Sequence, residues 1–88
     1  MALESRNVHV GGRRTSIRLE PEMWDALEDI CRREKMTVNE FCSKVETARR
    51  DAGLTAATRV FLLLYFRAVA SGSGVSPLWR SRDFWERT

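Results

Sequence analysis

A seven-residue stretch of alternating character, residues 13–19, constrains the fold of this chain more than any other part of the sequence. In an extended strand, successive side chains point to opposite faces of the sheet. One face of this segment would then suit a core, and the other would be polar and carry two guanidinium groups. The inward-facing residues would be Thr15, Ile17 and Leu19, and the outward-facing residues Arg14, Ser16 and Arg18.

The backbone of this strand needs a partner, because the N–H and C=O groups of an isolated strand are unpaired. Upstream, a Val-His-Val segment ends at Val10 and is followed by two glycines, which can form a tight hairpin turn. Such a hairpin would pair Val10 with Arg13 and Val8 with Thr15. The glycines are also compatible with a flexible basic arm. We favour the arm, but the sequence leaves both interpretations open.

The sequence beyond this strand predicts helices, so the expected fold class is mainly α. Pro21 fits the first turn of a helix, because the N–H that proline lacks would be unsatisfied there. Apolar residues then recur at spacings of three and four as far as Glu34, which predicts an amphipathic helix. Only Lys35 and Met36 remain as a turn before the next helical signal.

That signal is a capping box formed by Thr37 and Glu40, in which each side chain accepts a hydrogen bond from the backbone N–H of the other residue. A second helix should begin there, and Gly53 suits its end. Thr55 can cap a third helix that runs to about Ala70 and is apolar nearly all round. So much apolar surface must be covered on more than one side, either by a second copy of the chain or by the C-terminal tail.

The tail begins at a Ser-Gly-Ser-Gly break and combines aromatic with basic residues. Its aromatic side chains can dock on the third helix, line a peptide site or stay mobile, and the sequence does not choose among these. The residues concerned are Trp79, Phe84, Trp85, Arg80, Arg82 and Arg87.

Charge is distributed unevenly along the chain, which has a formal net charge of +3. Residues 1–19 carry four arginines against Glu4, whereas residues 20–34 carry six acidic residues against two arginines. The positive charge therefore lies on the strand and the negative charge on the first helix. This polarity favours an anionic partner at one end of the molecule, and nucleic acid is the commonest such partner.

The residues with chemical reactivity do not form a catalytic or metal-binding pattern. Cys31 and Cys42 fall on apolar helix faces, where a cysteine usually acts as a small buried hydrophobe. His9 is the only histidine, and no set of residues has the spacing of a zinc site. We therefore expect no enzyme activity and no cofactor or metal. The absence of a secretory signal and of a membrane-length apolar run predicts a cytoplasmic protein without a membrane partner.

A strand of about seven residues, a proline entry, a helix, a short turn and a capped helix follow one another in a specific order. The chain resembles the ribbon-helix-helix DNA-binding family, the fold of the Arc and methionine repressors, and in particular a subgroup of small bacterial proteins. The resemblance covers residues 13–52, a little under half the chain. One departure is that many members have a glycine in the turn where Lys35-Met36 stand here. The residues that carry the resemblance are 14–22, Trp24, Leu27, Ile30 and 37–41.

This resemblance implies a homodimer in which one N-terminal strand from each chain pairs antiparallel, so that a two-stranded ribbon enters the major groove of double-stranded DNA. The implied function is that of a sequence-specific DNA-binding protein, such as a repressor or other transcription regulator. By the family pattern, Arg14, Ser16 and Arg18 contact the bases. The N-terminus of the second helix, at Thr37, Val38 and Asn39, contacts phosphate together with Arg13. The implied dimer core contains Thr15, Ile17, Leu19, Trp24, Leu27, Phe41 and Val45.

A competing hypothesis is a protein-interaction module, antitoxin-like or adaptor-like, that holds a protein partner with the third helix and the aromatic tail. The basic tail departs from the acidic tails that antitoxins often have. In either case we expect four segments: an arm or flanking strand at residues 1–12, the ribbon-helix-helix core at 13–52, the third helix at 53–71 and the tail at 72–88.

Overall fold

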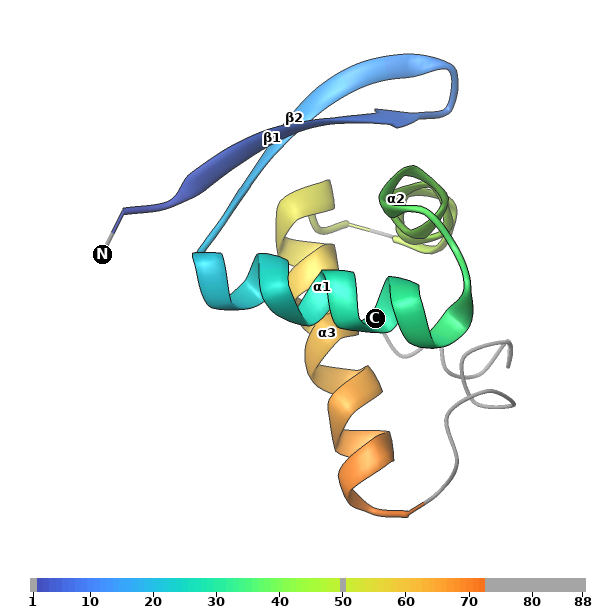
Figure 1. Cartoon of the computed structure of the whole chain (residues 1–88). Coiled ribbons are helices and arrows are strands. Elements are labelled where there is room, and N and C mark those ends of the chain that lie inside the picture. Colours follow the sequence, from blue (N-terminus) through green and yellow to red (C-terminus); the bar gives the residue numbers. More distant parts are fainter. Residues whose placement is uncertain (1, 50, 73–88) are drawn as a thin grey trace.

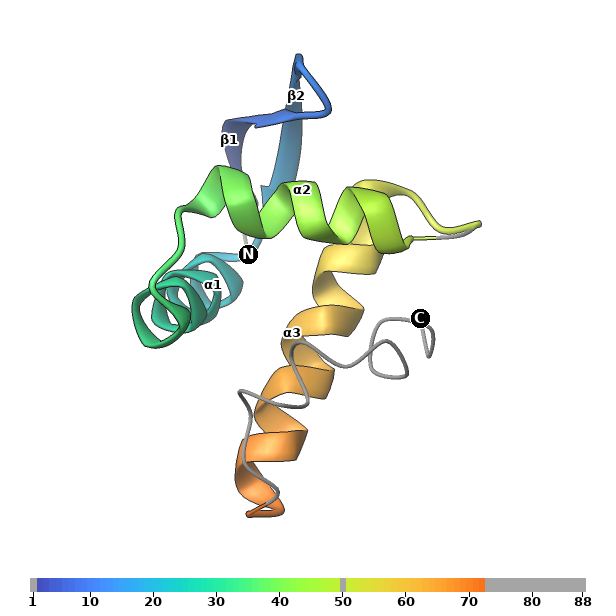
Figure 2. The same cartoon turned by 90° about the vertical axis from the view of Figure 1, so that its right-hand side faces the viewer.

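A computed structural model describes residues 2–49 and 51–72. The described chain forms an N-terminal β-hairpin followed by three helices, with the hairpin lying across one end of the helices (Figure 1). Turning the molecule shows α2 running beneath the hairpin and α3 extending away from it (Figure 2). The elements are β1 (Glu4–Val10), β2 (Arg13–Leu19), α1 (Pro21–Glu34), α2 (Val38–Ala48) and α3 (Leu54–Ala70).

The partner of the alternating strand β2 is β1 of the same chain. The two strands pair antiparallel, with Val10 opposite Arg13 and Val8 opposite Thr15, which is the register expected for a Gly-Gly turn. Both turn glycines have positive φ angles, as a two-residue hairpin turn requires. The arm that we favoured for this segment is therefore wrong, and so is the expectation of one N-terminal strand per chain. An arm would leave Val8 and Val10 in water, whereas in the hairpin each is 1% exposed.

The first helix has the predicted bounds, and the second begins where predicted. Pro21 stands at the start of α1, and the capping box of α2 is complete, because the Thr37 hydroxyl accepts from the Glu40 N–H at 3.0 Å and the Glu40 carboxylate accepts from the Thr37 N–H at 2.8 Å. Lys35 ends α1 in the left-handed region, with φ of 55°, at the turn where many members of the family that the chain resembles have glycine. A side chain in this conformation costs roughly 1 to 2 kcal/mol, so the turn forms without glycine but under strain.

The connection between α2 and α3 differs from the expectation. Gly53, with an extended backbone, is the N-cap of α3 and does not terminate α2, which already ends at Ala48. Thr55 lies inside the first turn of α3 and does not cap it. The N–H of Ala57 bonds to the Gly53 carbonyl at 2.9 Å, so the helix begins one residue before Thr55.

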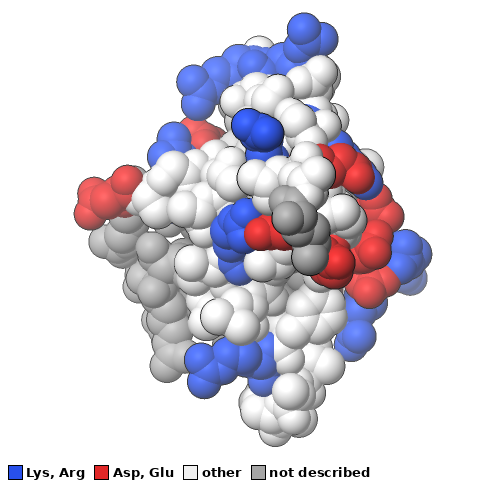
Figure 3. Space-filling model, turned by 90° about the vertical axis from the view of Figure 1, so that its left-hand side faces the viewer, with Lys and Arg blue, Asp and Glu red and all other residues white. Residues whose placement is uncertain are grey.

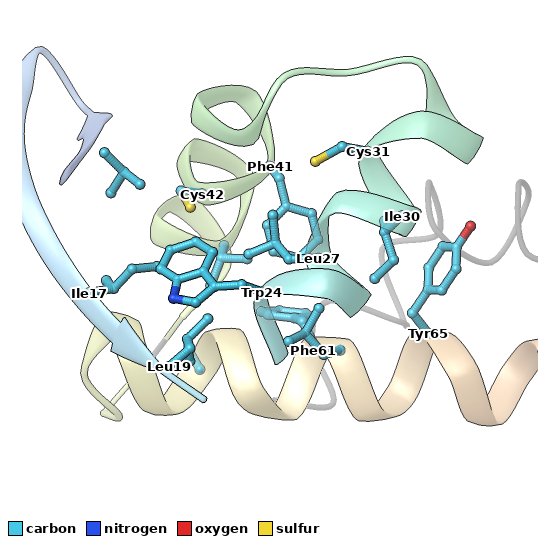
Figure 4. Close-up of a cluster of buried hydrophobic side chains, with 14 of the residues drawn as sticks. Ile17, Leu19, Trp24, Leu27, Ile30, Cys31, Phe41, Cys42, Phe61 and Tyr65 are labelled. Atoms are coloured by element: carbon cyan, nitrogen blue, oxygen red, sulfur yellow. The ribbon is translucent and has the colours of Figure 1, made fainter. Parts of the chain in front are cut away.

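The core of the chain lies between the inner face of the hairpin and all three helices. Trp24 of α1 is 0% exposed and lies beside Ile17 and Leu19 of β2 (Figure 4). Its indole N–H donates to the Glu4 carbonyl at 2.8 Å, and the Arg6 guanidinium stacks over the ring at 4.5 Å. This tryptophan therefore joins the hairpin to the helices through packing, a hydrogen bond and a cation–π contact.

The two cysteines are free and buried, as predicted for structural residues. Burial raises the pKa of the Cys31 thiol to about 11 and that of Cys42 to about 12. Both therefore stay protonated near neutral pH, and a protonated thiol is a poor nucleophile.

Against the part of the chain that the structure describes, the third helix buries one side. Phe61, Leu62 and Tyr65 are buried against the rest of the chain, whereas Val60 is 42% and Leu63 57% exposed. The predicted role of the tail in covering this helix lies outside the described residues, which end at residue 72. Among the helices described, none has the length and apolar character needed to cross a membrane.

Candidate nucleic-acid interface

The outer face of the hairpin carries six exposed polar side chains and no apolar one. Because the strands pair residue by residue, three side chains from β1 stand directly opposite three from β2. Sequence reasoning identified the β2 half of this face but not the β1 half. The alternation in β1 contained the missing signal, since its buried valines required the intervening residues to point outward. The opposing pairs are Ser5 with Arg18, Asn7 with Ser16, and His9 with Arg14.

The hydrogen bonds around His9 show which way the backbone groups of the hairpin point. The His9 N–H donates to the Asn39 side-chain oxygen at 3.0 Å, and the His9 carbonyl accepts from the Ser43 hydroxyl at 3.4 Å. His9 therefore turns both backbone groups away from β2, which makes His9 and Arg14 a non-hydrogen-bonded pair of the ladder. Such pairs alternate along an antiparallel ladder, and their side chains lie closer together than those of hydrogen-bonded pairs.

The same alternation distinguishes the two edges of the hairpin. The edge of β1 is held by α2 at His9, whose backbone groups bond to Asn39 and Ser43. On β2, the backbone groups of Arg14, Ser16 and Arg18 point away from β1. Within residues 2–49 and 51–72, no hydrogen bond reaches these groups. The β2 edge is therefore open, and a groove of about 500 Å³ lies beside it, against the end of α2 and the start of α3.

The two arginines predicted to read bases are exposed, and among the described residues neither forms an ion pair. Arg6, on the inner face, is instead bound by Glu28 and Glu4, each at 2.6 Å, and these bonds raise the pKa of its guanidinium. Figure 3 shows basic side chains along the end of the molecule that carries the hairpin, with acidic side chains gathered below it. The Arg14 and Arg18 guanidiniums are thus available to an anionic partner.

The predicted phosphate-contacting residues are partly engaged within the chain. Arg13 pairs with Glu46 at 3.3 Å, although its side chain is still 65% exposed. The Asn39 side chain holds β1, and the Thr37 N–H is taken by the Glu40 carboxylate, a bond that lowers the pKa of that carboxyl group. Among the described contacts, the N–H groups of Val38 and of Asn39 keep no partner at the start of α2. These two groups are what remains there to bind an anion.

The residues predicted for the dimer core lie in the interior of the single chain. Six of them are at most 1% exposed without any second copy, and Thr15 is half-buried. The hairpin supplies the covering strand that the prediction assigned to a partner chain, which is why one chain buries them alone. The six are Ile17, Leu19, Trp24, Leu27, Phe41 and Val45.

Comparison with known proteins places this architecture in a family. The family model described as a ribbon-helix-helix domain matches residues 3–66, well over half of the chain. Comparisons with curated proteins and with solved structures found no match. Ribbon-helix-helix domains are generally found in DNA-binding regulators that usually bind DNA as dimers. The matched range contains the hairpin, α1, α2 and most of α3, and this chain belongs to the ribbon-helix-helix family.

Proposed function

We propose that the protein is a sequence-specific regulator of transcription, acting as a repressor in the cytoplasm, that places the outer face of its hairpin in the major groove of double-stranded DNA. The observation that carries the proposal is the polar outer face, on which two arginines without an ion pair among the described residues flank a serine. Arg14 and Arg18 each have the fork geometry that grips O6 and N7 of guanine. Ser16 between them contacts a base through its hydroxyl.

The dimensions of the hairpin suit this placement. Neighbouring strands lie about 4.8 Å apart, and the major groove is about 12 Å wide and admits a two-stranded ribbon. Phosphates beside the groove would bind the N–H groups of Val38 and Asn39, which have no partner among the described contacts, where the dipole of α2 favours negative charge. Arg13 would join them by exchanging Glu46 for a phosphate.

The open edge of β2 supports a homodimer. A second β2 strand, related by a two-fold axis, would satisfy the outward backbone groups of Arg14, Ser16 and Arg18. The two β2 strands would then lie at the centre of a four-stranded sheet with a β1 strand on each side. Four strands span about 14 Å between their outer axes, more than the groove width of about 12 Å, so only the central β2 pair would enter the groove fully.

Ser16→Pro tests this pairing. Proline removes the Ser16 N–H, which points to the open edge, so the variant should keep the hairpin but lose the dimer. We expect sedimentation equilibrium to give the mass of a dimer for the unmodified protein and for Ser16→Ala, and the mass of a monomer for Ser16→Pro. Circular dichroism establishes that the proline variant is folded. A folded Ser16→Pro protein that remains dimeric would show that the subunits associate through another surface.

Selection of bound duplexes from a random pool tests the function itself. We expect enrichment of a motif that contains guanines and has two-fold symmetry, because each subunit presents the same residues to one half-site. Binding should weaken steeply as salt rises, since phosphate contacts release counterions. A pool in which no sequence is enriched would contradict sequence-specific binding.

A second candidate function is that of a protein-interaction module. The observation that favours it is the exposed apolar pair Val60 and Leu63 on α3, since adjacent exposed apolar residues often mark protein contacts. A random pool without an enriched motif would favour this function over DNA binding.

A further inference from the structure

We propose that Asn7 and Ser16, one from each strand of the hairpin, form a single unit that selects adenine in the DNA site. This inference rests on the proposed DNA-binding function and adds to it a base and a residue of β1. It starts from a side-chain hydrogen bond, in which the Ser16 hydroxyl donates to the Asn7 side-chain oxygen at 2.7 Å.

The hairpin register brings these two side chains together. Asn7 and Ser16 are directly opposed, both are exposed on the outer face, and their pair is of the non-hydrogen-bonded kind, in which side chains approach most closely. The Asn7 amide therefore lies next to the Ser16 hydroxyl, and a base that Ser16 reaches from the centre of the face is also within reach of Asn7.

The hydrogen bond determines what the pair can offer to DNA. A serine hydroxyl has one proton, and here that proton is used by Asn7, so Ser16 faces the groove only as an acceptor. Asn7 keeps both N–H groups of its amide as donors, and its oxygen retains a second lone pair. The unit thus presents a donor and acceptors side by side.

Adenine is the base that matches this pattern. Its major-groove edge carries the N7 acceptor beside the N6 amino donor, so asparagine can bind both atoms at once. Guanine offers two acceptors, N7 and O6, and would leave the acceptors of the pair unpaired. Cytosine offers the N4 donor without an adjacent acceptor on the same base. The pattern therefore favours adenine over the other purine by hydrogen bonding alone.

The position of the adenine within the DNA site follows from the spacing of residues along β2. Arg14 and Arg18 lie two residues to either side of Ser16 on the same face. A strand rises about 3.3 Å per residue, which is close to the spacing of about 3.4 Å between successive base pairs. The selected adenine should therefore lie between two guanines, about two base-pair steps from each.

Asn7→Ala tests the assignment, with Ser5→Ala as the matched control. Ser5 is also exposed on the outer face of β1, but it stands opposite Arg18 and not Ser16. Affinities are measured for the selected duplex and for versions with each other base pair at the adenine position. We expect the unmodified protein to prefer adenine by roughly tenfold or more, Asn7→Ala to bind all four versions with nearly equal affinity, and Ser5→Ala to keep the preference.

Variants at Ser16 test the contribution of the β2 residue of the Asn7–Ser16 pair. Ser16→Ala removes the hydroxyl that fixes the Asn7 amide and should lose the adenine preference, whereas Ser16→Thr keeps a hydroxyl and should retain it. Asn7→Asp replaces the two donors by an acceptor and should also lose the preference, which gives a second variant if Asn7→Ala does not fold.

Two outcomes would overturn the inference. The adenine preference could survive in a folded Asn7→Ala protein, or that variant could bind every duplex more weakly by the same factor, which is the behaviour of a phosphate contact. Both outcomes leave the proposed function intact, provided that guanine preference persists at the neighbouring positions. Loss of all sequence preference in the unmodified protein would instead contradict the function.

Discussion

Arg18→Ala should weaken binding to the selected duplex by roughly 5- to 150-fold for each half-site, the range that corresponds to about 1 to 3 kcal/mol for one bidentate arginine–guanine contact. The loss should be confined to duplexes with guanine at the position that Arg18 reads, so discrimination at that base pair should disappear. Arg18 is exposed on the outer face of β2 and forms no ion pair among the described residues, so the chain itself provides no competing partner. Fluorescence anisotropy with duplexes that differ at one base pair measures both effects.

Arg32→Ala is the matched control, because it removes the same charge from a residue of α1 whose guanidinium pairs with Asp29. This variant should lower the affinity for all duplexes slightly and equally, through the net charge alone. If Arg18→Ala behaved like Arg32→Ala, Arg18 would contribute only charge and the assignment of base contacts would be wrong.

Trp24→Ala should lower the free energy of unfolding by about 3 to 5 kcal/mol, as expected for truncation of a fully buried tryptophan. This is a large part of the roughly 5 to 15 kcal/mol that stabilises a typical domain. The variant leaves a cavity between the hairpin and the helices, and it removes both the hydrogen bond to the Glu4 carbonyl and the stacking of Arg6. Urea unfolding followed by circular dichroism measures the change.

Two further variants show which part of the effect comes from packing. Trp24→Phe keeps most of the ring but loses the indole N–H, so its cost should be smaller than that of Trp24→Ala. Leu63→Ala truncates a side chain that is 57% exposed and should change stability by only about 0.5 kcal/mol. An equal loss for Leu63→Ala and Trp24→Ala would mean that Trp24 is not the centre of the core.

Much of the fold could be predicted from local signals in the sequence. The alternation in residues 13–19, the proline at the start of α1 and the capping box of α2 each act over a few residues, and the structure confirms the elements they predict. The buried, free state of Cys31 and Cys42 also followed from their place on apolar helix faces. Signals of this kind depend on backbone geometry and on solvation, and so they are visible without tertiary structure.

The features that were missed depend on contacts between distant segments. The burial of Val8 and Val10 beneath the hairpin requires α2 to be in place, and Asn39, which holds β1, lies thirty residues from His9. The sequence alone therefore could not choose between an arm and a strand. Gly53 and Thr55 were misassigned for a related reason, because either residue can occupy a helix boundary and only the path of the chain determines which one does.

The candidate site was predicted in part. The outward direction of Arg14, Ser16 and Arg18 follows from the period of a strand and is confirmed, whereas their contacts with DNA stay predictions. Ser5, Asn7 and His9 complete the outer face, which was missed because β1 was not predicted as a strand. The apolar residues were assigned to a dimer core because β2 was expected to pair with a strand of another chain. In the structure, β1 of the same chain is that pairing strand.

The unequal edges of the hairpin limit how large an assembly built by strand addition can become. Asn39 and Ser43 occupy the outward backbone groups of β1 at His9, so a further chain cannot pair with β1 there, whereas no described bond occupies the outward groups of β2. If two copies joined through their β2 strands, as proposed, each remaining sheet edge would be a β1 strand whose own α2 occupies it at His9. In such an assembly α2 would hinder growth at each end of the sheet, where the open-ended stacking that makes exposed strands prone to aggregation begins.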